Sequence, residues 1–126
     1  MATFYETRIT IVGPDVADLV DGGVLILFAD GAPPELAEVS VLHAVTTGPT
    51  PEAPPVGAIL RVGAVEARLT AIGGLAWAKV ADMGHVVINF DGSATSNRPG
   101  ELNASEVDTG LLAGALTPGA SITITG

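Results

Sequence analysis

The chain has 126 residues, of which 48% are hydrophobic and 15% are charged, so it can bury one core, and disorder as the dominant state is excluded. Fourteen Asp and Glu against five Lys and Arg give a net charge of −9, which argues against a nucleic-acid partner and an anionic membrane surface and suits a basic protein partner. The sequence contains no cysteine, which excludes disulfides, thiolate metal sites and a cysteine nucleophile.

The first 13 residues show no basic stretch followed by an apolar one, so we expect no secretory signal. The longest strongly apolar run, at residues 24–28, is far shorter than the roughly 20 residues that a membrane-spanning helix needs. We therefore expect one cytoplasmic domain, residues 1–126, without insertion into a membrane.

Alternation of apolar and polar residues with a period of two runs through most of the chain and indicates β-strands. The predicted elements, in chain order, are a strand at 5–11, a helix at 14–20, strands at 24–28 and 39–45 separated by a helical turn at 33–38, a strand at 65–71, a helix at 74–83, and strands at 85–90 and 122–124. Sixteen glycines and nine prolines punctuate these strands, which favours a mainly β sandwich or barrel.

A proline-rich stretch, TTGPTPEAPPVG at residues 46–57, separates two of the predicted strands. Proline donates no hydrogen bond to a sheet, so this stretch is not a central strand. We predict an exposed, semi-stiff loop here and a second loop at about residues 91–100.

The chain has two histidines, His43 and His85, each in or beside an apolar strand, and both strands are expected to belong to the same small core. A neutral imidazole nitrogen can attack a phosphoryl group, and a neighbouring imidazole can donate to the phosphoryl oxygens. Two other interpretations stay open from the pattern alone. Each histidine is a hydrogen-bonded core residue, or the pair binds a metal together with Asp82 or Asp91.

Two blocks of sequence stand out: ILFADGAPPEL at residues 26–36, followed by VLH at 41–43, and MGHVVINFDG at 83–92. Both blocks resemble the glucitol/sorbitol-specific IIA component of the phosphoenolpyruvate-dependent sugar phosphotransferase system. They are similar to the family's FxxGAPxxL turn with its phosphorylatable histidine and to its GHVxxxFDG motif. Weaker agreement covers nearly the whole chain in the same order.

The resemblance implies a small closed β-barrel of about six to eight strands with one to three short helices. It implies that His43 accepts a phosphoryl group from the histidine-containing phosphocarrier protein and passes it to a IIB component, while a IIC component imports glucitol. His85 falls on the histidine of the second motif, for which we expect an assisting role. The expected protein is a phosphotransferase-system component with a phosphohistidine intermediate and without a cofactor or metal.

The sequence departs from the family in one place near the site. Val45 stands where the family often has a second histidine, and the proline-rich loop follows it. A regulatory or protein-interaction domain without catalytic activity, built on the same barrel, is therefore the alternative. Phosphoryl transfer predicts that the ring of His43 is reachable from solvent, so that a docked donor can load it.

Overall fold

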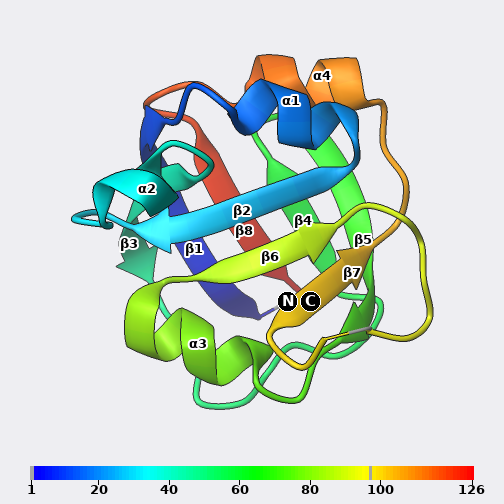
Figure 1. Cartoon of the computed structure of the whole chain (residues 1–126). Coiled ribbons are helices and arrows are strands. Elements are labelled where there is room, and N and C mark those ends of the chain that lie inside the picture. The colour runs from blue at the N-terminus through cyan, green and yellow to red at the C-terminus, as the bar shows by residue number, and fades with distance from the viewer. Residues whose placement is uncertain (1, 97) are drawn as a thin grey trace.

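The computed structural model describes residues 2–96 and 98–126, which form a closed barrel of eight strands with four short helices (Figure 1). The strands are β1 (Thr3–Val12), β2 (Val24–Ala29), β3 (Val41–Thr47), β4 (Ile59–Val62), β5 (Val65–Ile72), β6 (Val86–Asn89), β7 (Glu101–Ala104) and β8 (Ser121–Thr125). The helices are α1 (Val16–Asp21), α2 (Pro34–Ala37), α3 (Ala76–Met83) and α4 (Thr109–Ala115). The predicted closed, mainly β barrel is confirmed.

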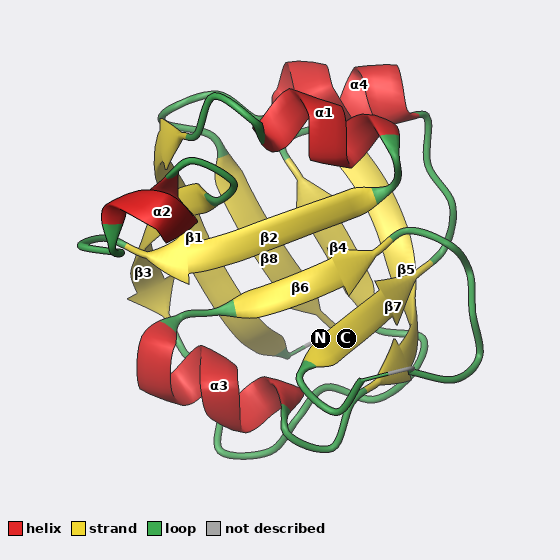
Figure 2. Cartoon of the chain, viewed as in Figure 1, coloured by secondary structure: helices red, strands yellow, loops and turns green. Residues whose placement is uncertain are grey.

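The strands follow one another around the barrel in the order β1-β3-β2-β6-β7-β5-β4-β8, and β8 closes the barrel by pairing with β1. Two neighbouring pairs, β2 with β3 and β6 with β7, are parallel, and the others are antiparallel. A parallel pair needs a crossover connection, and α2 lies in the crossover from β2 to β3. Helices α1 and α4 lie side by side at one end of the barrel, and α3 lies at the opposite end (Figure 2).

The core fills the barrel because alternate side chains of each strand point inward. In β5, Ala67, Leu69 and Ala71 are buried, while the residues between them are exposed or half-buried. The helices add buried residues to the same core, among them Val20 of α1 and Leu112 of α4. Fully burying a side chain of this size contributes roughly 1.5–3 kcal/mol, so the inward faces supply most of the stabilisation.

Several elements differ from the sequence predictions. Strands β4 and β7 and helix α4 were not predicted, because four-residue strands give too little periodicity and α4 contains two glycines. The signal for α4 was its N-cap, where the Asp108 carboxylate accepts from the backbone N–H of Leu111 at 3.0 Å. Strand β3 begins at Val41 and continues through Thr47. The first two residues of the loop predicted at 46–57 therefore belong to the sheet.

The remaining part of the proline-rich loop is attached to the barrel by a tryptophan. The Nε1–H group of Trp77 in α3 donates to the carbonyl of Thr50 at 2.6 Å, and Pro54 in the same loop is buried. Within the described ranges, no helix is both long and apolar enough to cross a bilayer.

Candidate functional site

His43 lies in β3 between β1 and β2, opposite Ile9 on one side and Ala29 on the other. Its side chain points into the barrel, and the residue is only 1% exposed. The expectation that the ring is open to solvent is therefore wrong for this structure. The reason is the position of the residue on the inward face of β3, where the side chain packs with the core.

Both ring nitrogens of His43 have polar partners. Nδ1 lies 2.6 Å from Oγ1 of Thr7 in β1, and Nε2 lies 2.8 Å from the carbonyl oxygen of Gly84. A carbonyl oxygen only accepts, so in the neutral ring Nε2 carries the proton and donates to Gly84, while the hydroxyl of Thr7 donates to Nδ1. The surroundings of the ring thus determine its tautomer.

Burial is the largest influence on the protonation of His43, and it lowers the pKa of the imidazole below its ordinary value of 6.5. The hydrogen bond to Gly84 and the negative charge of Asp30 act in the opposite direction but are smaller. Asp30 follows β2, and its backbone N–H donates to the carbonyl of His43 at 3.1 Å. The ring is therefore neutral near pH 7, which is the nucleophilic form of histidine.

Gly84 covers the ring and ends α3 with φ of 59° in the left-handed region. A Cβ atom at this position would lie 2.9 Å from Cβ of Ala29 and 3.2 Å from Cε1 of His43. Both the backbone conformation and the space therefore require glycine. No role in the site was predicted for Gly84, and the structure places it directly against the ring.

Tyr5 and Thr7 of β1 also belong to the site and were missed by the sequence analysis. The ring of Tyr5 meets the ring of His43 edge-on, with 6.1 Å between centroids, and Trp77 packs against the other side of Tyr5 at 5.9 Å. Thr7 lies on the same inward face of β1 as Tyr5 and Ile9. A hydroxyl on the apolar face of a predicted strand was the available signal, because a buried hydroxyl needs a partner.

His85 follows Gly84 directly, so the two histidines meet through the backbone of Gly84. The ring of His85 is half-buried, with Nδ1 donating to the carbonyl of Leu27 at 3.0 Å and the ring of Phe28 stacked at 4.9 Å. Among the described residues, no hydrogen bond joins the two imidazole rings. The structure therefore brings His43 and His85 into one region but gives them separate partners.

The surface beside Gly84 is partly apolar. Met83, the residue before Gly84, is 39% exposed. Val45, two residues after His43 in β3, is also exposed, at 43%. Asp82, the residue before Met83, is exposed. Asp30, whose negative charge acts on His43, is exposed as well. An apolar surface with acidic neighbours thus adjoins the residue that covers His43.

The described residues do not support the interpretation that the two histidines bind a metal. Across residues 2–96 and 98–126, no group of three or more His, Asp or Glu side chains is arranged to hold a metal ion. The metal site considered from the sequence combines the two histidines with Asp82 or Asp91. Asp91 instead accepts from the side-chain amide of Asn103 at 2.9 Å.

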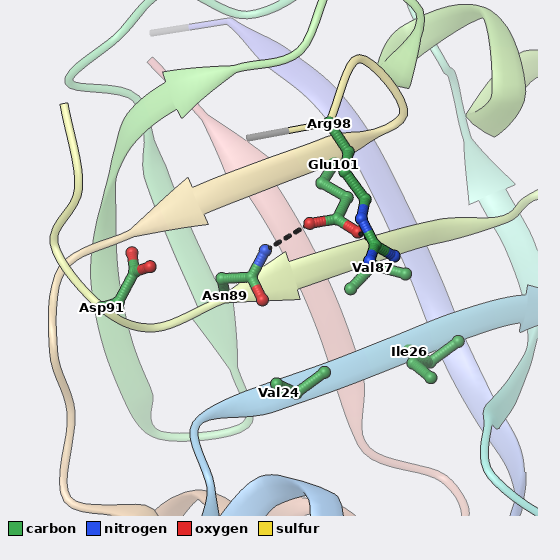
Figure 3. A pocket seen from close by; sticks show the side chains of 7 residues that line it. All are labelled: Val24, Ile26, Val87, Asn89, Asp91, Arg98 and Glu101. Atoms are coloured by element: carbon green, nitrogen blue, oxygen red, sulfur yellow. Dashed lines mark hydrogen bonds and ion pairs between the residues drawn. The ribbon is translucent and has the colours of Figure 1, made fainter. Parts of the chain in front are cut away.

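A separate depression of about 470 Å³ lies on the outer face of β2, β6 and β7 (Figure 3). Val24, Ile26 and Val87 form its apolar part, and Asn89 and Glu101 are joined across it by a hydrogen bond of 2.8 Å. Neither His43 nor His85 lines it. The depression is therefore distinct from the site around His43.

Comparisons with known proteins agree with this architecture. A crystal structure of a phosphotransferase-system IIA component from Enterococcus faecalis V583 matches with a TM-score of 0.72 over 96% of this chain and 99% of that chain, at 16% sequence identity. The chain therefore has the fold of that IIA component.

The family model described as "PTS system glucitol/sorbitol-specific IIA component" matches residues 4–123. Proteins named "PTS system glucitol/sorbitol-specific EIIA component" from Shigella flexneri and from Escherichia coli (strain K12) are each 30% identical over 105 residues, which is 83% of this chain and 84% of each relative. The chain belongs to the glucitol/sorbitol-specific IIA component family of the phosphotransferase system. The resemblance found in the two sequence motifs is confirmed.

Proposed function

We propose that residues 1–126 form one cytoplasmic IIA domain that carries a phosphoryl group on His43. The donor is the phosphohistidine of the histidine-containing phosphocarrier protein, and the acceptor is a IIB component that phosphorylates glucitol/sorbitol during import through IIC. The observation that supports this best is the state of the His43 ring: its lowered pKa keeps it in the neutral, nucleophilic form, and its two nitrogens are oriented by Thr7 and Gly84. The step needs no metal or cofactor.

The nitrogen that a donor reaches is Nε2. Nδ1 faces Thr7, which is 0% exposed inside the barrel. Nε2 faces Gly84, which lies between the exposed Met83 and the half-buried His85. A donor therefore approaches from the Gly84 side, and the carbonyl of Gly84 turns away when the donor docks. The glycine backbone tolerates this rotation because it has no Cβ.

The transfer is balanced without a net proton change. The lone pair of Nε2 attacks phosphorus, an Nε2–P bond forms, and the N–P bond of the donor breaks with its electron pair returning to the donor imidazole. In the resting ring Nε2 carries the proton, so before the attack Nε2 releases its proton to solvent and Nδ1 takes one up. The reactive ring then keeps its proton on Nδ1, and the product is a phosphohistidine with an Nδ1–H group. The phosphoryl group spreads its charge over three oxygens, which need hydrogen-bond donors nearby.

We propose that His85 supplies one such donor. Because Nδ1 of His85 donates to the carbonyl of Leu27, its other nitrogen, Nε2, is the one available to a phosphoryl oxygen when the ring is protonated. The stacking on Phe28 holds the ring in place. We therefore assign His85 the assisting role and His43 the role of phosphoryl acceptor.

The surface around Gly84 suits the proposed partners. Met83, next to Gly84, offers an exposed apolar side chain, and the chain carries a net charge of −9. Apolar contacts at the centre of an interface with charged residues around them favour a partner that has an apolar patch within a basic surface. The proposed phosphocarrier and IIB components would dock here in turn.

The test is phosphorylation with phosphoenolpyruvate, enzyme I and the phosphocarrier protein. The wild-type chain should take up one acid-labile, base-stable phosphoryl group, His43→Gln should take up none, and His85→Gln should take it up more slowly at His43. Uptake by His43→Gln at the wild-type rate would show that the assignment of His43 is wrong.

The second candidate function is the interaction domain without catalytic activity. It is favoured by the 1% exposure of His43 and by Val45 at the position of the family's second histidine. Tight binding to a partner that is the same for wild type and His43→Gln, with no phosphoryl uptake, would support this alternative over the carrier.

A further inference from the structure

The hydroxyl of Thr7 lies between two acceptors. Its Oγ1 atom is 2.6 Å from Nδ1 of His43 and 2.8 Å from the carbonyl oxygen of Ala44. A hydroxyl has one hydrogen and can also accept. When Nδ1 lacks a proton, the hydroxyl donates to Nδ1. When Nδ1 carries a proton, the hydroxyl accepts a hydrogen bond from this N–H group and donates its own hydrogen to the carbonyl of Ala44.

The partners of Thr7 distinguish it from the other buried hydroxyls of the chain. Thr7 is 0% exposed and lies opposite Val45 of β3, two residues from His43, and its Oγ1 atom contacts the ring of His43. In contrast, the buried hydroxyls of Ser40 and Thr125 have no hydrogen-bond partner among the described residues. Burying a hydroxyl has a cost unless it is hydrogen-bonded, and at Thr7 the bonds go to the reactive ring and to the strand that bears it.

We infer that Thr7 is the positioning residue of His43. In the reactive ring the hydroxyl of Thr7 accepts a hydrogen bond from Nδ1–H and donates its own hydrogen to the carbonyl of Ala44. The proton of the ring is thereby held on Nδ1, and the lone pair is left on Nε2. This inference rests on the proposed function, in which Nε2 receives the phosphoryl group. In the closed structure the same hydroxyl turns the other way, because Nε2 then donates to Gly84. Thr7 thus serves both tautomers by rotation of one O–H bond.

The hydrogen bond between Nδ1 of His43 and Thr7 should be strongest when the ring is phosphorylated. Once phosphorus is bonded to Nε2, the ring carries a positive charge with its proton on Nδ1, and a hydrogen bond from a charged donor is stronger than a neutral one. Oγ1 of Thr7 is the acceptor that the structure places at Nδ1. A valine at this position keeps the shape of the side chain and removes the acceptor.

The experiment compares Thr7→Val, Thr7→Ser and the matched control Thr125→Val, which makes the same change at a buried hydroxyl without a partner. Thr7→Val should take up phosphoryl groups at least about tenfold more slowly. Losing a hydrogen bond to the reacting ring raises the activation free energy by about 1.4 kcal/mol or more, and about 1.4 kcal/mol corresponds to a tenfold change in rate. Thr7→Ser and Thr125→Val should stay within about threefold of wild type.

A spectroscopic measurement separates positioning from folding. The chain has two histidines, so nitrogen spectra of His-labelled protein are assigned with His85→Gln. In the phosphorylated wild type, phosphorus should be on Nε2 of His43, and Nδ1 should carry a slowly exchanging proton. Phosphorus on Nδ1, or an Nδ1 proton that exchanges as fast as in free phosphohistidine, would overturn the inference even if Thr7→Val fails to fold.

The two proposals fail in different ways. If His43 is phosphorylated but Thr7→Val has the wild-type rate, the role of Thr7 is wrong and the proposed function stands. If wild type takes up no phosphoryl group, the proposed function is wrong, and the nitrogen spectra of the free proteins decide about Thr7. A ring of His43 with the same tautomer ratio in wild type and Thr7→Val then refutes positioning, whereas a changed ratio supports it.

Discussion

The carbonyl oxygen of Gly84 lies 2.8 Å from Nε2 of His43, so the residue that ends α3 covers a side chain 41 positions earlier in the chain. This contact determines which nitrogen is protonated in the structure, and it occupies Nε2, the nitrogen that we propose receives the phosphoryl group. The backbone segment between α3 and β6 therefore packs directly against the ring of His43.

Replacing Gly84 by alanine should strain both the turn and the histidine. The new Cβ would lie 2.9 Å from Cβ of Ala29 and 3.2 Å from Cε1 of His43, and φ is 59°. We expect a loss of about 1–3 kcal/mol in the free energy of unfolding and shifted ring resonances of His43. Chemical denaturation and histidine NMR measure the two effects.

The control for this change is Gly92→Ala. Gly92 also has a positive φ, of 68°, but a Cβ atom there meets nothing within 4 Å. This variant should lose only the backbone contribution, about 1 kcal/mol, and leave the resonances of His43 in place. Equal effects of the two substitutions would contradict the close contact between Gly84 and the ring.

The stability of the protein should fall as the solution is acidified because of His43. Burial lowers the pKa of this imidazole, so below about pH 6.5 the unfolded chain takes up a proton that the folded chain does not. The contribution of His43 to the free energy of unfolding is therefore largest above about pH 6.5. It decreases as the pH falls toward the pKa of the folded state, and the loss at pH 5 is at most about 2 kcal/mol. Urea denaturation at several pH values measures the slope.

His43→Gln is the reference for this slope, since glutamine does not titrate. Its stability should change less than that of wild type between about pH 7 and pH 5. Asp91 does not interfere, because its pKa is lowered from an ordinary value of 3.8 and it stays ionised in this window. Parallel curves for the two proteins would refute the neutral, buried state of His43.

Tyr5 should titrate at unusually high pH. Its burial raises the pKa of the phenol to about 12, and it is the single tyrosine of the sequence, so the ultraviolet absorbance of tyrosinate reports on it alone. In denaturant the same group should titrate near its ordinary value of 10.0. Between these values the unfolded chain releases the proton first, so stability decreases as pH rises.

Tyr5→Phe removes this alkaline sensitivity. The hydroxyl of Tyr5 is buried with no hydrogen-bond partner among the described residues, so its removal should change the free energy of unfolding at neutral pH by less than about 1 kcal/mol. Stability that falls between pH 10 and 12 in this variant as steeply as in wild type would show that another group is responsible.

Asn103 should control the acidity of Asp91. Its side-chain amide donates to the carboxylate at 2.9 Å and is the largest cause of the lowered pKa of Asp91, followed by the backbone N–H of Ser93. Asn103→Ala should raise that pKa toward 3.8 and cost about 1–3 kcal/mol of stability, because a buried side chain and its hydrogen bond are lost. Carboxyl NMR titration measures the shift.

Asn89→Ala is the matched control, because the amide of Asn89 donates to Glu101 and not to Asp91. The pKa of Asp91 should be unchanged in this variant. The lowered pKa of Asp91 stabilises the folded state above 3.8, and this contribution disappears as pH falls through the folded value. In Asn103→Ala this part of the acid dependence should become smaller, and an unchanged acid dependence would contradict the assigned cause.

Local sequence patterns were sufficient for the strands that are long enough to alternate. The apolar faces of β1, β5 and β8 and the helical spacing in α3 follow from side-chain periodicity, because the pleat and the helical turn repeat at fixed intervals. The two motif blocks were likewise sufficient to assign the chain to its family and to match His43 and His85 to the histidines of the two motifs. These features depend on residues that are close together in the chain.

Only the tertiary structure decided what surrounds His43. Val41, Leu42 and His43 are all buried, so alternation along β3 could not tell which side chain faces the interior. Thr7 and Gly84, which contact the ring, are 36 and 41 positions away and are brought there by the pairing of β1 with β3 and of β2 with β3 and β6. Such pairings depend on how distant segments close into a barrel, and residue spacing within one strand carries no information about them.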